Sequence, residues 1–134
     1  MSLYLDASAL VKLVVREPET AALRRYLRRH RIEHRVTSAL SRTEVVRAVF
    51  DGRFDTVTRA RDVLRGTGLI ALDARVLDDA ATLAPGTPLR SLDAIHLASA
   101  RLLGTELRAL ITYDERMSRA ARALGLVTAD PGRR

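Results

Sequence analysis

Acidic side chains stand at two places where an apolar run ends and a helix is expected to begin. Asp6 lies in LYLDASAL, Leu3 to Leu10, and Asp114 lies in ITYDERM, Ile111 to Met117. Asp is a favoured helix cap, because its carboxylate accepts hydrogen bonds from the free N–H groups of the first turn. Carboxylates are also the oxygen ligands that Mg²⁺ and Mn²⁺ prefer in proteins. Each residue therefore fits both a structural and a metal-binding role.

A third acid, Glu44, has a role that depends on where its helix begins. The segment SRTE, Ser41 to Glu44, forms a capping box if the helix starts at Ser41. If Ser38 caps the helix instead, the box is lost and Glu44 lies within the second turn. The spacing leaves both starts open.

A fourth acid, Asp93, lies in RSLDAIHLASA and follows a plausible helix cap at Ser91 by two residues. A negative charge in the first turn is favoured by the helix dipole. The residues four and seven positions later on the same face are Leu97 and Ala100, which are apolar. We therefore expect the Asp93 side chain to point inward, which a solvated partner of the dipole has no need to do.

The elements that must position these acids are short apolar runs that alternate with amphipathic stretches. We expect strands over Ser2–Leu5, His34–Ser38, Leu69–Leu72, Ala109–Tyr113 and Leu126–Thr128. Helices are expected over Ala7–Val15, Glu19–His30, Ala39–Phe50, Phe54–Arg65, Ala74–Leu83, Ser91–Leu103 and Glu115–Leu124. This alternation predicts a parallel sheet covered on both faces, the doubly wound α/β class. The tail from Ala129 to Arg134 is expected to be frayed.

In such a sheet ligands bind beyond the carboxyl ends of the strands, which is where Asp6 and Asp114 are expected. Asp73 marks the limit of this pattern, because LIALDA also ends a strand with Asp before a helix. The pattern does not separate Asp73 from Asp6. We interpret Asp73 as a cap, and that choice depends on the family resemblance described below.

The composition excludes several classes of protein. The chain has 134 residues, 47% of them hydrophobic, so we expect a single domain over residues 1–134 with its own core. The absence of Cys excludes a disulfide framework, a zinc-thiolate site and a cysteine nucleophile. No run approaches the roughly 18 apolar residues that span a bilayer. We therefore expect a cytoplasmic protein with no membrane partner.

The charge of the chain suits a polyanionic partner. There are 23 basic and 16 acidic residues, a formal net charge of +7, and Lys12 is the only Lys. The planar guanidinium group of Arg pairs with phosphate through two hydrogen bonds. A compositional bias of the genome explains Arg over Lys equally well, but it does not explain the positive sum.

Several arginines are candidates for contacts with phosphate. The segment LRRYLRRHRIEHR, Leu23 to Arg35, can grip an RNA backbone, form a solvated helix face or bind a partner, and the sequence leaves these open. The apolar sides of Leu23 and Leu27 fit the core or a dimer contact. Closer in sequence to the acids, and favoured as RNA contacts, are Arg42, Arg116, Arg119 and Arg122.

The segments LDASALVKL, TSALSRTEVVRA, LRSLDAIHLASA and ITYDERM resemble, in this order, those of PIN domains, specifically the VapC-type toxins of toxin–antitoxin pairs. They extend from Leu5 to Met117, although Phe50 to Leu89 matches only in general pattern. The resemblance implies a PIN-like doubly wound fold and a divalent-metal-dependent ribonuclease. It also implies a homodimer that is neutralised by a VapB-like antitoxin, whose tail enters the catalytic groove.

Residue by residue, the resemblance implies a catalytic set of Asp6, Glu44, Asp93 and Asp114, with hydroxyl groups beside it at Ser8 and Thr112. Of these we expect Asp6, Asp93 and Asp114 to bind Mg²⁺ or Mn²⁺, and Glu44 to bind through water or to orient the attacking water. Hydrolysis of RNA would then leave a 5′-phosphate and a 3′-hydroxyl. Without metal the four acids repel one another, so at least one should have a raised pKa.

Other functions fit the residues less well. An aspartyl-phosphate phosphotransferase usually has a second Asp where this chain has Ser8, and a receiver domain needs a Lys late in the sheet, whereas Lys12 is on the first helix. His96 is expected to be structural, because an all-oxygen site has no use for imidazole. A PIN-fold RNA-binding module without catalysis stays as the alternative, although an acidic cluster would weaken RNA docking.

Overall fold

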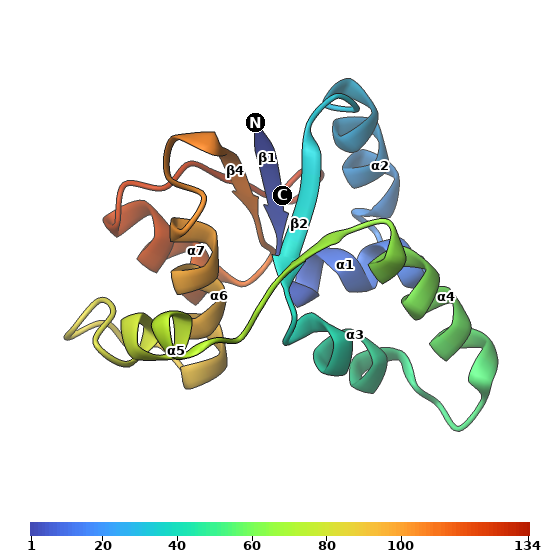
Figure 1. Cartoon of the computed structure of the whole chain (residues 1–134). Coiled ribbons are helices and arrows are strands. Elements are labelled where there is room, and N and C mark those ends of the chain that lie inside the picture. The colour runs from blue at the N-terminus through green and yellow to red at the C-terminus, as the bar shows by residue number, and fades with distance from the viewer.

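Short apolar runs form a parallel five-stranded sheet in the computed structural model, which describes residues 1–134 (Figure 1). The strand order is β3-β2-β1-β4-β5, and every neighbouring pair is parallel. The strands are β1 (Ser2–Leu5), β2 (His34–Ser38), β3 (Gly68–Ile70), β4 (Leu107–Ile111) and β5 (Thr128–Ala129). The predicted α/β class is confirmed.

Seven α-helices cover the two faces of this sheet. One face is covered by α1 (Ala7–Val14), α2 (Thr20–Arg29), α3 (Ser41–Val49) and α4 (Phe54–Arg65), as Figure 1 shows. The other face is covered by α5 (Ala74–Ala81), α6 (Ser91–Arg101) and α7 (Glu115–Ala123). None of the helices combines the length and apolar character that crossing a bilayer requires.

Alternation along β1 divides the core into two layers. Leu3 and Leu5 are fully buried on the face packed by α1 to α4, whereas Tyr4 is fully buried on the opposite face. Against Tyr4 pack Leu97 from α6 and Met117 from α7. A central strand buried on both faces is the reason that SLYL reads as a continuous apolar run.

The boundaries of several elements differ from those predicted, because pairing and capping decide where they end. Strand β3 stops at Ile70 instead of Leu72, since its partner β2 ends at Ser38 and Leu72 is 38% exposed. Strand β4 starts earlier than Ala109, because Leu107 pairs with Ser2. It ends at Ile111, where the chain turns to cap α7. Pairing with neighbours that are distant in sequence is not visible in local hydropathy.

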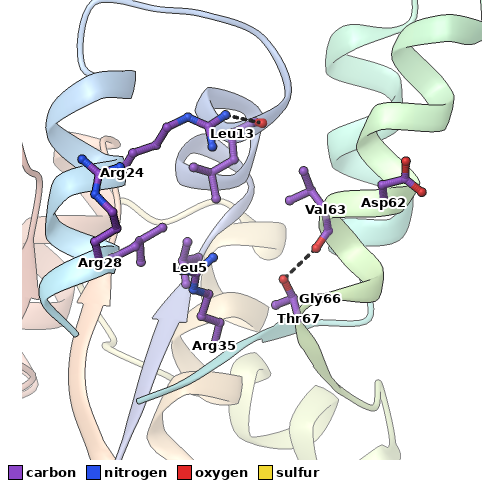
Figure 2. Close-up of a pocket in the computed structure, with 10 residues that line it drawn as sticks. Leu5, Leu13, Arg24, Arg28, Arg35, Asp62, Val63, Gly66 and Thr67 are labelled. Atoms are coloured by element: carbon purple, nitrogen blue, oxygen red, sulfur yellow. Dashed lines mark hydrogen bonds between the residues drawn. The ribbon is translucent and has the colours of Figure 1, made fainter. Parts of the chain in front are cut away.

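The arginines of α2 face solvent, and its leucines belong to the core. Leu23 and Leu27 are buried, whereas Arg24 and Arg28 are exposed. The two arginines line a pocket of about 300 Å³ between α1, α2 and α4, together with Arg35 from β2 (Figure 2). None of the candidate acids lines this pocket. The leucines thus serve the core rather than a dimer contact.

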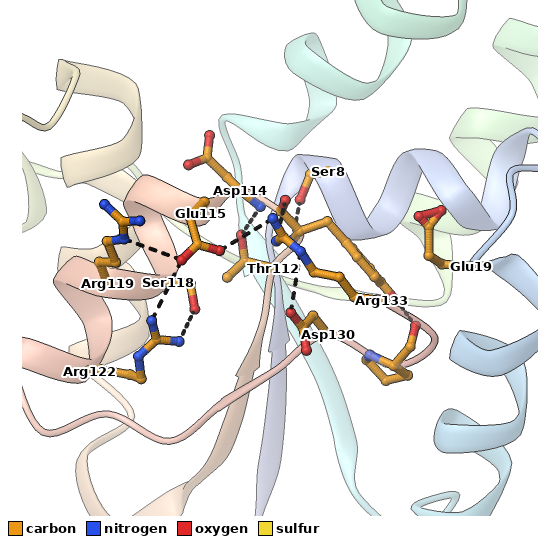
Figure 3. A network of polar contacts seen from close by, with 12 residues as sticks. Ser8, Glu19, Thr112, Asp114, Glu115, Ser118, Arg119, Arg122, Asp130 and Arg133 are labelled. Atoms are coloured by element: carbon orange, nitrogen blue, oxygen red, sulfur yellow. Dashed lines mark hydrogen bonds and ion pairs between the residues drawn. The ribbon is translucent and has the colours of Figure 1, made fainter.

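The prediction that the C-terminal tail is frayed is wrong. The Tyr113 hydroxyl donates a hydrogen bond of 2.8 Å to the Pro131 carbonyl, and Arg133 Nη1 donates one of 3.1 Å to the Tyr113 carbonyl. Gly132 has φ +84°, and a Cβ atom there would lie 2.7 Å from the Ala22 side chain. The tail therefore packs against the turn after β4, as Figure 3 shows for Arg133.

Burial along α6 predicts how two leucines of this helix respond to truncation. Leu97→Ala should lower the free energy of unfolding by about 2–5 kcal/mol, because Leu97 is fully buried and leaves a cavity. Leu92→Ala, at a position that is 47% exposed, should change it by less than about 0.5 kcal/mol. Urea unfolding of both variants measures the difference, and equal losses would contradict this packing.

Candidate active site

Two of the candidate acids, Asp6 and Asp114, follow the carboxyl ends of β1 and β4, where the order of the sheet reverses. The strands β2 and β4 lie on opposite sides of β1, so the connections leave in opposite directions at this edge, where ligands bind in such sheets. Leu5 pairs with Ile111, and the Asp6 N–H donates a hydrogen bond of 3.2 Å to the Ile111 carbonyl. Asp6 and the turn that leads to Asp114 are therefore neighbours.

Asp6 is a helix cap that is also fixed by a second strand. Its Oδ1 accepts hydrogen bonds from Ser8 Oγ at 2.6 Å and from the Ala9 N–H at 3.0 Å. Its Oδ2 accepts one from Thr112 Oγ1 at 2.5 Å. The residue is 2% exposed, and this burial raises the pKa of Asp6, although nearby His96 and the hydrogen bonds act in the opposite direction.

The two predicted hydroxyl groups connect Asp6 to the turn after β4. Ser8 Oγ accepts a hydrogen bond of 3.0 Å from the Tyr113 N–H, and Thr112 Oγ1 accepts one of 3.1 Å from the Asp114 N–H. Figure 3 shows Ser8, Thr112 and Asp114 gathered at this turn. The position of Asp114 is thereby coupled to that of Asp6.

Asp73 caps its helix without any such connection. Its Oδ1 accepts a hydrogen bond of 3.0 Å from the Val76 N–H, and the residue is exposed. The interpretation of Asp73 as a cap is confirmed. Only the tertiary structure separates it from Asp6, because the difference is a hydroxyl group supplied by a distant strand.

Asp93 and Asp114 share one guanidinium group. Asp114 caps α7 through the Met117 N–H at 3.0 Å, and Asp93 points inward as predicted, with 9% of the residue exposed. Arg90 Nε lies 3.4 Å from Asp93 Oδ2, and Arg90 Nη2 lies 3.6 Å from Asp114 Oδ2. The helix cap is Arg90 rather than the predicted Ser91, which is already inside α6.

The pKa of Asp93 is raised, first by burial and second by the negative charge of Asp114. The expected raised pKa is therefore confirmed at Asp6 and at Asp93. The expected cause was mutual repulsion, but burial is the larger cause at both residues. Repulsion from a neighbouring acid contributes only at Asp93.

Glu44 is held by His96 rather than by a capping box. Helix α3 starts at Ser41 after Leu40, so the capping box at Ser41 does not form. Ser38 Oγ instead accepts a hydrogen bond of 3.1 Å from the Leu40 N–H in the turn before α3, which agrees with the earlier start. His96 Nε2 lies 2.5 Å from Glu44 Oε1, and His96 Nδ1 lies 2.7 Å from the Tyr4 hydroxyl. Tyr4, His96 and Glu44 thus form a series of hydrogen-bonded side chains that begins in the core and ends at Glu44.

His96 is 1% exposed, so the prediction of a structural histidine agrees with its burial, but the contact with Glu44 was missed. A signal existed in the sequence. His96 lies three residues after Asp93 and so shares its helix face. The same spacing places Arg90, three residues before Asp93, on that face, and its contacts with the acids were missed as well.

The donor set fits a hard divalent cation in its chemistry, since it consists of carboxylate and hydroxyl oxygens. As they stand, no three His, Asp or Glu side chains form a group that would hold a metal ion. Their oxygens are instead engaged in separate contacts. Asp6 is bound by Ser8 and Thr112, Glu44 contacts His96, and the other two acids contact Arg90.

The four arginines favoured as RNA contacts are all exposed, and they lie on α3 and α7. Arg119 Nε lies 3.3 Å and Arg122 Nη2 3.8 Å from Glu115, as Figure 3 shows. Arg42 and Arg116 form no ion pair. Their cationic groups are therefore free for an anionic partner, whereas Arg119 and Arg122 are partly neutralised.

Comparison with known proteins gives one consistent result. A family model described as PIN domain matches residues 3–123. The chain is 52% identical over 131 residues to "Ribonuclease VapC46" of Mycobacterium tuberculosis, which covers 97% of this chain and 98% of that protein. It is 44% identical over 133 residues to "Ribonuclease VapC47" of the same species, with 97% of each covered.

A solved structure resembles the fold as well. The crystal structure of PAE2754 from Pyrobaculum aerophilum superposes with a TM-score of 0.65. The match covers 96% of this chain and 83% of that one, at 21% sequence identity. At this identity the likeness concerns the arrangement of the elements.

The burial of Asp6 predicts opposite effects for two substitutions. Asp6→Asn keeps an acceptor for the cap and removes a buried charge, so the thermal midpoint at pH 7 should hold or rise. Asp6→Ala should cost about 0.5–2 kcal/mol, because the cap is lost. The advantage of Asn should shrink as the pH falls through the raised pKa of Asp6, since the wild-type carboxyl group then becomes neutral.

The matched control is Asp73→Asn, at an exposed cap that no distant segment contacts. Calorimetry of the metal-free variants over a series of pH values provides the comparison. A markedly lower midpoint for Asp6→Asn would mean that Asp6 is chiefly a structural cap.

Proposed function

The chain belongs to the PIN domain family and, within it, to the VapC ribonucleases, and from this premise we propose that it is a metal-dependent toxin of a toxin–antitoxin pair. Its substrate is RNA, and its reaction is hydrolysis of a phosphodiester bond. The catalytic residues of the proposal are Asp6, Glu44, Asp93 and Asp114.

One observation carries the assignment of the site. Asp93 and Asp114 lie at the starts of different helices and contact the same guanidinium group, and Asp6 follows β1 at the same edge of the sheet. Parallel sheets bind ligands at this edge, at the switch point of the strand order. The raised pKa of Asp93, caused first by burial and second by the charge of Asp114, is typical of residues at functional sites and supports the proposal.

In the proposed site Asp6, Asp93 and Asp114 hold the cation. A bound Mg²⁺ or Mn²⁺ supplies activation of water and stabilises the charge that develops on the phosphate oxygens. Ser8 and Thr112 fix both oxygens of Asp6, so this carboxylate is presented in one orientation. The conformational entropy of the Asp6 side chain is thus already lost in the folded protein.

Glu44 has a different role in the proposal. It is the acid that orients the attacking water, because His96 holds its Oε1 from the core side and 23% of its side chain is exposed. His96 is a positioning residue, fixed in turn by the Tyr4 hydroxyl. Attack of water on phosphorus with loss of the 3′-oxygen leaves a 5′-phosphate and a 3′-hydroxyl.

The remaining parts of the proposal concern partners. The net charge of +7 and the exposed Arg42, Arg116, Arg119 and Arg122 favour an RNA backbone as the binding partner. A VapB-like antitoxin, a homodimer and a cytoplasmic location belong to the same proposal, as does a single domain over residues 1–134. They are supported by the similarity to VapC ribonucleases over nearly the whole chain.

The proposal predicts cleavage that depends on a divalent cation. The purified chain should cleave total cellular RNA with Mg²⁺ or Mn²⁺ and not with EDTA, and the products should be substrates for poly(A) polymerase, which requires a 3′-hydroxyl. Asp114→Asn should lower the rate at least about 100-fold, since even the outer partners of metal ligands account for 10- to 100-fold. The exposed cap variant Asp73→Asn should retain the wild-type rate.

Two outcomes contradict this function. Cleavage that survives EDTA and yields cyclic phosphates indicates histidine chemistry instead of a metal mechanism. RNA that binds and stays intact with both cations indicates the alternative, a PIN-fold interaction module without catalysis.

The contact between His96 and Glu44 gives a separate prediction. His96→Leu should lower kcat about 10- to 100-fold with a smaller change in KM, because Glu44 loses the group that orients it. His96→Gln should recover part of kcat, since its amide also reaches Glu44. Steady-state kinetics measures both values, and a loss of activity that only follows the fraction of unfolded protein would reduce His96 to a structural residue.

A further inference from the structure

Arg90 makes contacts that no proposed step of the reaction uses. Its side chain is 69% exposed, yet it contacts the carboxylates of two helices at once. These contacts are the only ion pairs of Asp93 and of Asp114. A solvent-exposed arginine that spans two acids of a catalytic site requires an explanation beyond capping of α6.

We propose that Arg90 is an internal counter-ion that occupies the place of the metal between Asp93 and Asp114, and that it must leave before a divalent cation binds. Arg90 thereby sets the cation concentration at which the site is loaded. The inference rests on the proposed function, because it takes Asp93 and Asp114 as metal ligands.

The atoms in contact show that Arg90 and a cation compete directly. Asp114 Oδ1 is already bonded to the Met117 N–H, so Oδ2 is the oxygen left for a ligand role, and Arg90 contacts Oδ2. At Asp93 the guanidinium contacts Oδ2 as well. Asp93 has no other hydrogen-bond partner for its side chain. A cation and Arg90 therefore require the same oxygen of Asp114 and the same carboxylate group of Asp93.

The charges explain why both states are accessible. Arg90 brings one positive charge to two carboxylate groups, whereas a divalent cation brings two. A divalent cation therefore compensates the pair better. Because Arg90 is exposed, its ion pairs are weak and its release into solvent is easy. Arg90 therefore reduces the repulsion between the two acids when no metal is bound, and a divalent cation can still displace it.

The test is the affinity of the purified chain for Mn²⁺, measured by isothermal titration calorimetry without RNA. Arg90→Gln should bind Mn²⁺ about three- to tenfold more tightly than wild type, which corresponds to the loss of two competing exposed ion pairs. Arg90→Lys keeps the competing charge, so its affinity should stay closer to that of wild type. A residue that only supported the site would change the affinity in the opposite direction.

Arg65→Gln is the matched control. Arg65 also pairs with an Asp three residues away, Asp62 on α4, and its side chain is 74% exposed. It lies just before β3, at the amino end of the sheet and away from the acids. The control therefore removes the same charge without touching the site. Its effect on Mn²⁺ affinity should stay below about 1.5-fold at physiological ionic strength, because distant charges are screened.

Thermal unfolding gives a second readout that is independent of activity. Without metal, Arg90→Gln should unfold at a lower temperature than wild type, since the two acids lose their counter-ion. At saturating Mn²⁺ this difference should vanish, because Arg90 no longer contacts the acids in the loaded protein.

Each outcome decides one of the two proposals. In the first case, wild type binds Mn²⁺ and cleaves RNA, but Arg90→Gln binds Mn²⁺ no more tightly than Arg65→Gln does. This result overturns the role of Arg90 and leaves the proposed function intact. If neither wild type nor the variants bind Mn²⁺, the proposed metal site fails, and the role of Arg90 fails with it.

Discussion

The buried carboxylate of Asp6 is the constraint on which the site depends. A carboxylate at 2% exposure is stable only when its oxygens are hydrogen-bonded, because water cannot solvate it. Its three donors come from the start of α1 and from the end of β4. The same hydrogen bonds therefore join two segments that are distant in sequence. A shift between β1 and β4 would remove the hydrogen bond from Thr112 to Oδ2, so the register of the two strands and the position of the acid are maintained together.

The other acids contact partners that are buried to different degrees, from the buried His96 to the exposed Arg90. Glu44 contacts a histidine that is itself held in the core by Tyr4. Asp93 Oδ2 and Asp114 Oδ2 contact an exposed arginine, Arg90, while Asp114 Oδ1 caps α7. Asp6 and Glu44 are thus oriented by buried partners, whereas Asp93 and Asp114 each present one oxygen to an exposed cationic group.

The acidic cluster contrasts with the charge of the whole molecule. The net charge is +7, and arginines line the pocket on α2 and the surfaces of α3 and α7. A positive field attracts a polyanion at long range, while local negative charge keeps phosphate away from the acids unless a cation lies between them. In the proposed function, binding of RNA and loading of metal would thus be electrostatically linked. The C-terminal tail adds Arg133 to this pattern, since it packs against the turn after β4 beside Glu115.

The amino-acid sequence by itself determined the fold class and the order of the elements, because both depend on local hydropathy and on helix caps, and through the family resemblance it predicted the four acids of the proposed site. It also determined that Asp93 points inward, since its helix face is apolar. Only the tertiary structure decided the partners of those acids. The difference between Asp6 and Asp73, the contact between His96 and Glu44, the bridge made by Arg90 and the docked tail all depend on contacts between segments that the sheet brings together. Such contacts follow from strand order and helix packing, and a pattern within a few neighbouring residues carries no information about them.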